Sequence, residues 1–80
     1  MNEKELLWRI GQRVKQIREE KGITQQSIAN NIDTDRANIS RLESGRVDSR
    51  ITTLYRLATD LGVPLPTLLE IDYTEAKQKK

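Results

Sequence analysis

The chain has 80 residues, which is enough for one small domain with a modest hydrophobic core. It contains neither cysteine nor histidine, which excludes a disulfide scaffold, a zinc finger and a thiol nucleophile and removes the commonest general base. No apolar run approaches the ~20 residues of a membrane span, so a cytoplasmic protein without a membrane partner is expected. The net charge of +2 permits a nucleic-acid partner without requiring one.

The N-terminal quarter of the chain predicts one amphipathic helix that ends at Gly22, a residue suited to a left-handed stop. Its apolar residues recur at intervals of three and four and therefore share one face: Leu6, Ile10, Val14 and Ile17. Arg9 and Arg13 lie on the polar side, where solvent is their expected environment.

Two short helices follow. Thr24 is a good cap for the first, which runs to Asn31, and Asp35 caps the second, which runs to about Ser44. Asp33 belongs to the tight turn between them, because aspartate tolerates the left-handed conformation better than most residues.

The last third of the chain predicts a polar loop over 46–50 and two further helices. The fourth helix ends at Gly62, and the fifth begins at Pro64 and Pro66, since proline is tolerated only in the first turn. The predicted fold class is all-α, a compact bundle of about five short helices. We expect a single domain over residues 1–71 and a disordered tail over residues 72–80, which lack apolar periodicity.

The link between the two short helices is too short for a deep antiparallel hairpin. The helices must therefore cross steeply, with their backbones close together at Ala29. This is the geometry of a helix-turn-helix, whose second helix can project outward.

The wider frame resembles the phage-repressor/Cro (Xre-like) family over about residues 9–70. The matching positions combine core residues, caps and stops: Ile10-Gly11, Ile17-Arg18, 19–25, Ala29, 39–45, Leu57-Ala58 and Leu61-Gly62-Val63. The resemblance implies a lambda-repressor-like DNA-binding domain, in a family whose members are usually regulators and often bind pseudo-palindromic operators as dimers. A sequence-specific, double-stranded DNA-binding transcriptional regulator, acting as a repressor and a homodimer, is the expected function.

A recognition helix enters the major groove with its N-terminal end foremost, so long or amide-bearing side chains belong in its first turns. The predicted base-reading residues are Arg36, Ala37, Asn38 and Arg41. Arginine pairs with guanine, asparagine pairs with adenine, and an alanine methyl contacts thymine. The predicted phosphate-contacting residues are Gln25, Ser44, Arg46, Ser49 and Arg50.

The resemblance also implies a buried salt bridge between Arg18 and Glu43 and a dimer interface at the fifth helix, formed by Pro64, Leu65 and Leu68. Two positions depart from the family pattern, because Asp33 stands where glycine is usual and Asp35 where serine or threonine is usual. Arg50 falls at the expected cap of the fourth helix, so Ser49 is an alternative cap.

Two other functional classes fit the sequence less well. An enzyme is not expected, because no base is present to activate a nucleophile and no carboxylate cluster indicates a metal. Neither a cofactor nor a small-molecule ligand is expected. The alternative is a protein-interaction module or antitoxin-type partner protein with weak or no DNA binding, and the arginines of the third predicted helix argue against it.

Overall fold

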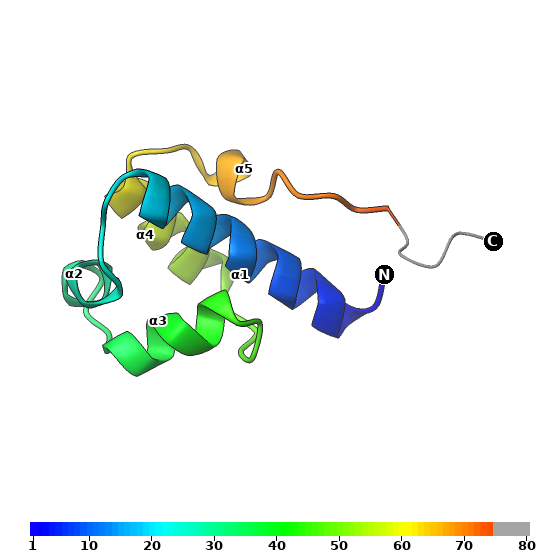
Figure 1. The fold of residues 1–80 in the computed structure, drawn as a ribbon, viewed down its shortest axis with the longest axis horizontal. Helices are drawn as coiled ribbons and strands as arrows, with labels where there is room; N and C mark the ends of the chain where they lie inside the picture. The colour runs from blue at the N-terminus through cyan, green and yellow to red at the C-terminus, as the bar shows by residue number, and fades with distance from the viewer. Residues whose placement is uncertain (75–80) are drawn as a thin grey trace.

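The structure is a computed structural model that describes residues 1–74. These residues form five α-helices: α1 (Glu3–Glu20), α2 (Gln25–Asn31), α3 (Arg36–Glu43), α4 (Ile51–Leu61) and α5 (Leu65–Leu68). Figure 1 shows α1 as the long central rod, with α2 and α3 on one side and α4 and α5 behind and above it. The predicted all-α bundle is confirmed. No helix within residues 1–74 has the length and apolar content that crossing a membrane requires.

The helix ends are set by the residues that the sequence indicated. The Thr24 hydroxyl accepts a hydrogen bond from Ser27 N at 3.0 Å, and the Asp35 carboxylate accepts one from Asn38 N at 2.7 Å. Gly22 ends α1 with φ at +70°. The suggested cap at Ser49 is wrong, because α4 begins after Arg50 without a side-chain cap bond.

The core lies between α1 and the other four helices. Its fully or nearly fully buried apolar side chains come from all five: Val14, Ile17, Ile28, Ala29, Ile32, Ile39, Leu42, Leu54, Leu57, Ala58, Leu61 and Leu68. Leu68 was expected at a dimer interface, and the structure corrects this, because its side chain is entirely enclosed within the protomer. A leucine in a helix of only four residues is needed to hold that helix against α4 and α1.

A backbone contact joins α1 to the C-terminal end of α3. A Cβ added at Gly11 would lie 2.3 Å from the carbonyl oxygen of Leu42 and 2.6 Å from that of Glu43. One turn earlier on α1, a Cβ added at Gly45, just beyond α3, would lie 2.6 Å from the Cα of Trp8. Two glycines therefore let α1 lie directly on the end of α3.

The segment after α5 lies along α1, where Arg9 and Arg13 hold it. Arg13 donates to the carbonyl of Thr67 at 2.9 Å and pairs with Glu70 at 3.1 Å. Arg9 donates to the carbonyls of Asp72 and Thr74. Both arginines are half-buried, so the expectation that they extend into solvent is wrong. Of the predicted disordered tail, residues 75–80 lie outside the described residues.

Candidate nucleic-acid interface

The turn between α2 and α3 sets the direction of α3. Asp33 adopts φ of +63°, and Thr34 N donates to the carbonyl of Ala29 at 2.9 Å, which closes the end of α2. The predicted left-handed turn is thus present at a non-glycine residue, a conformation that L-residues adopt only at some cost. In Figure 1, α2 is seen nearly end-on while α3 lies in the plane of the picture, so the two helices cross steeply.

One face of α3 is buried and the opposite face is exposed to solvent. Ile39, Leu42 and Glu43 are buried against the core. The four side chains predicted to read bases all lie on the exposed side: Arg36, Ala37, Asn38 and Arg41. Because the apolar residues of α3 fix its inner face, these four residues form a continuous outer edge, which we call the α3 edge.

Two amide side chains contact the two arginines of the α3 edge. Arg36 donates to the Gln25 Oε1 at 3.4 Å, and Arg41 donates to the Asn38 Oδ1 at 3.1 Å. The Asn38 Nδ2 donates in turn to the hydroxyl of Thr34 at 2.9 Å. Sequence reasoning placed these four residues on one surface but did not identify the contacts between them.

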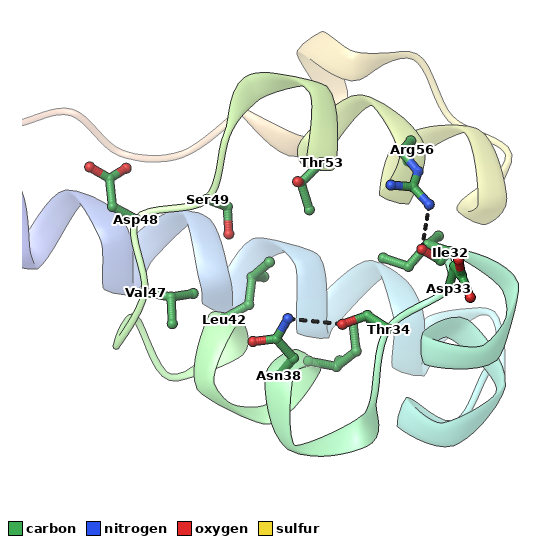
Figure 2. Close-up of a pocket in the computed structure, with 11 residues that line it drawn as sticks. Ile32, Asp33, Thr34, Asn38, Leu42, Val47, Asp48, Ser49, Thr53 and Arg56 are labelled. Atoms are coloured by element: carbon green, nitrogen blue, oxygen red, sulfur yellow. Dashed lines mark hydrogen bonds between the residues drawn. The ribbon is translucent and has the colours of Figure 1, made fainter.

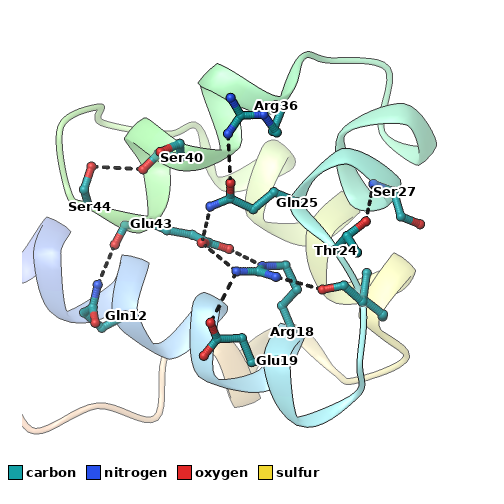
Figure 3. A network of polar contacts seen from close by, with 11 residues as sticks. Gln12, Arg18, Glu19, Thr24, Gln25, Ser27, Arg36, Ser40, Glu43 and Ser44 are labelled. Atoms are coloured by element: carbon teal, nitrogen blue, oxygen red, sulfur yellow. Dashed lines mark hydrogen bonds and ion pairs between the residues drawn. The ribbon is translucent and has the colours of Figure 1, made fainter.

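The predicted ion pair lies behind this surface and is present (Figure 3). Arg18 and Glu43 are only 7% and 2% exposed, and Arg18 donates to both oxygens of the Glu43 carboxylate, at 2.6 and 3.1 Å. Arg18 also donates to the carbonyl of Ile23 at 2.8 Å. The hydrogen bonds to Glu43 raise the pKa of the Arg18 guanidinium above its ordinary value, although burial acts in the opposite direction.

Gln25 joins the buried pair to the α3 edge. Its Nε2 donates to the Glu43 Oε1 at 2.9 Å, while its Oε1 accepts from Arg36 (Figure 3). The residue was predicted to contact phosphate, yet both of its amide atoms are already engaged within the domain. No signal in the sequence identifies these partners, because the approach of Gln25 to Glu43 and Arg36 depends on how α2 and α3 cross.

The loop after α3 carries the remaining predicted phosphate contacts. Arg46 and Arg50 are exposed, and Arg46 Nε donates to the Ser44 hydroxyl at 3.3 Å. Ser44 itself donates to the carbonyl of Ser40 at 2.9 Å. Ser49 is half-buried, and it faces a cleft behind α3 and not the outer surface of the loop.

That cleft has a volume of about 310 Å³ and lies between α3 and α4 (Figure 2). Thr34 and Asn38 line one wall, and Thr53 and Arg56 line the other. Arg56 donates to the carbonyl of Ile32, which ties α4 to the end of α2. The described part of the chain contains no cluster of three acidic, histidine or cysteine side chains placed to bind a metal.

A family model described as a helix-turn-helix domain matches residues 11–70. The chain belongs to this helix-turn-helix family. Within the family it is of the Xre-like type, as the resemblance over residues 9–70 implied. Helix-turn-helix proteins of this type are DNA-binding transcription regulators, and the chain is therefore one too.

Solved structures of other helix-turn-helix proteins support the same assignment. The restriction-modification controller protein C.AhdI from Aeromonas hydrophila is 26% identical and superposes with a TM-score of 0.80, over 85% of this chain and 99% of that one. The clp gene regulator ClgR from Corynebacterium glutamicum is 25% identical with a TM-score of 0.78, over 80% and 68%. The SinR protein in its complex with SinI protein is 32% identical with a TM-score of 0.70, over 76% and 60%. No curated protein matches the sequence.

Proposed function

We propose that this helix-turn-helix protein is a sequence-specific transcriptional repressor that binds a pseudo-palindromic operator as a homodimer, with α3 in the major groove. The α3 edge is the observation that carries the proposal. It presents two exposed arginines, an alanine and an asparagine on a helix whose opposite face is fully committed to the core.

The dimensions of α3 suit the groove. An α-helix with its side chains is about 10–12 Å across, which fits the ~12 Å width of the major groove of B-DNA, and the eight residues of α3 extend about 12 Å along it. Arg36 and Ala37 occupy the first turn, which enters the groove first, and Arg41 lies one turn later. Arginine discriminates guanine through paired hydrogen bonds, and the Ala37 methyl can contact thymine.

The phosphate contacts come from residues at the two ends of α3. Arg46 and Arg50 are exposed cations on the loop that follows it, and Ser44 is exposed at its start, whereas Ser49 reaches a phosphate only by turning out of the cleft behind α3. Gln25 lies on the other side, where the second N–H of its Nε2 can donate to a phosphate while the first donates to Glu43. The Asp35 carboxylate caps α3 by accepting from Asn38 N, so part of its charge is neutralised within the domain before DNA arrives.

A homodimer follows from size, because one copy of an 80-residue domain buries too little surface for tight operator binding. Pro64 is exposed and Leu65 half-buried at the fifth helix. Ile51 and Tyr55 add apolar surface one turn apart on α4, with 57% and 60% of each residue exposed. We place the dimer interface on these four residues and expect half-sites roughly 34 Å apart.

Selection of random duplexes by the purified protein tests the proposal. A two-fold symmetric motif with one helical turn between the half-site centres is the expected result. Sedimentation at micromolar concentration, with and without the selected duplex, tests the dimer. Salt-dependent retention on duplex DNA separates the proposal from the alternative, because a protein-interaction module would show no linear fall of log affinity with log salt.

A further inference from the structure

Asn38 differs from the other residues of the α3 edge, because both atoms of its amide are bound within the protein. Its Nδ2 donates to the Thr34 hydroxyl at 2.9 Å, and its Oδ1 accepts from the Arg41 guanidinium at 3.1 Å. Figure 2 shows the side chain directed at Thr34, on the wall of the cleft behind α3. Ala37, by contrast, presents only its methyl group outward.

The orientation of this amide is fixed by chemistry. A guanidinium carries only donors, so only the amide oxygen can face Arg41. The amide nitrogen must then face Thr34, whose hydroxyl can accept. The backbone of Asn38 is also held, because its N–H donates to the Asp35 carboxylate at 2.7 Å.

Thr34 is itself part of the turn that directs α3. Its backbone N–H donates to the carbonyl of Ala29 at 2.9 Å, directly after the left-handed residue Asp33. A continuous chain of hydrogen bonds therefore runs from the end of α2, through Thr34 and Asn38, to the guanidinium of Arg41.

We propose that Asn38 is a positioning residue that holds the Arg41 side chain ready for base recognition, with Thr34 as its anchor. This inference rests on the proposed function and assigns a specific role within it. Direct recognition of adenine by Asn38 would require each amide atom to serve a second partner beside Thr34 or Arg41. Holding Arg41 uses only the two bonds that the structure already contains, and it reduces the entropy that a long side chain loses on binding.

The size of the effect follows from that entropy. Ordering one side chain rich in rotamers costs about 0.5–1.5 kcal/mol on association, which is a factor of about 2–10 in affinity. We therefore expect Asn38→Ala and Thr34→Val each to weaken binding to the selected duplex about 2- to 10-fold. Both should also weaken the preference for the base pair at which Arg41→Ala relaxes specificity.

The test is a double-mutant cycle, measured as affinities for the selected duplex and for each single base-pair change. In the Arg41→Ala background, Asn38→Ala and Thr34→Val should have no further effect. Asn30→Ala is the matched control, because Asn30 is an exposed amide on α2 that accepts from Gln26 at 2.9 Å and has no hydrogen bond to an arginine among residues 1–74. It should leave the sequence preference unchanged.

A measurement without DNA tests the restraint itself. NMR relaxation of the Arg41 Nε–H group in the free protein should show order that Asn38→Ala and Thr34→Val remove. Arg50 is the internal reference, since its guanidinium has no hydrogen-bond partner among residues 1–74 and should be mobile in every variant.

Several results would overturn the proposal. If Asn38→Ala relaxes a base pair different from that of Arg41→Ala while Thr34→Val keeps the parent preference, Asn38 itself reads a base. An equal loss on every duplex, together with a lower melting temperature, would show a structural role only. If the parent binds the selected duplex and Arg41→Ala loses a base preference that Asn38→Ala and Thr34→Val both keep, the inference fails while the proposed function stands. Absence of duplex binding by the parent would overturn both.

Discussion

Replacing Glu43 by glutamine should destabilise this domain severely, although the two side chains have nearly the same shape. The carboxylate is almost completely buried, and three donors reach it: Arg18 Nε at 2.6 Å, Arg18 NH2 at 3.1 Å and Gln25 Nε2 at 2.9 Å. Glutamine keeps one oxygen for these donors and turns an amide N–H₂ toward one of them. The buried Arg18 charge would then keep only one counter-charge, the exposed carboxylate of Glu19 at 3.8 Å.

Breaking a buried ion pair by removing one partner costs about 3–5 kcal/mol. A domain of 80 residues has a total stability of about 4–12 kcal/mol, so this single change removes a large part of it. At about 4–8 °C per kcal/mol for a domain of this size, the melting temperature should fall by on the order of 20 °C.

Urea unfolding followed by circular dichroism measures this loss as a lower midpoint at an unchanged slope. Glu70→Gln is the matched control, because Glu70 also pairs with an arginine, Arg13, but its side chain is 66% exposed. An exposed pair contributes about 0–1 kcal/mol, so this variant should remain close to the parent. A Glu43→Gln variant within about 0.5 kcal/mol of the parent would refute the argument. So would an equal loss in both variants.

Four further outcomes are expected. Arg41→Ala should cost about 1–3 kcal/mol on the selected duplex and relax one base position, as titrations against single base-pair changes would show. Arg46→Ala should weaken all sequences alike and reduce the slope of log affinity against log salt by about one, and identical behaviour of these two variants would refute our division of roles. Gly11→Ala should lower the free energy of unfolding by about 1–3 kcal/mol, because the added methyl group meets the Leu42 carbonyl. This is expected although alanine is normally the better helix former, and an unchanged or higher urea midpoint would contradict it. The free energy of unfolding should stay constant between about pH 6 and 9, because the chain has no histidine. The pKa of Arg18 is raised in the folded state, so its contribution to stability is fully present below its unfolded pKa and is lost only as the pH rises through the folded pKa. A change of stability in calorimetric scans across this range would indicate another titrating group.

The features that depend on periodicity and local chemistry could be predicted from the sequence. The spacing of Ile39 and Leu42 fixes which side of α3 faces the core, and Thr24 and Asp35 satisfy the free N–H groups at the starts of their helices. The left-handed turn at Asp33 follows from the tolerance of aspartate for that conformation. These are properties of a few neighbouring residues, so the sequence alone determines them.

The features that depend on how the helices meet could not be predicted in the same way. Gln25 and Asn38 were placed on the correct surface, but which partners their amides find depends on the crossing of α2 over α3. Leu68 lies on a short helix, and periodicity over four residues cannot distinguish a core side chain from an interface side chain. Arg9 and Arg13 find carbonyl partners only because the chain after α5 returns along α1.

The contact at Gly11 has a consequence for attempts to reprogram this protein. A seam of backbone against backbone contains no side chain that could change its rotamer, so it cannot adjust gradually to a new neighbour. The tilt at which α3 would sit in a DNA groove therefore depends on the missing side chains of two glycines, Gly11 on α1 and Gly45 at the end of α3. New specificities should be sought by exchanging outward-facing side chains such as Arg36 and Ala37, while α1 is left untouched.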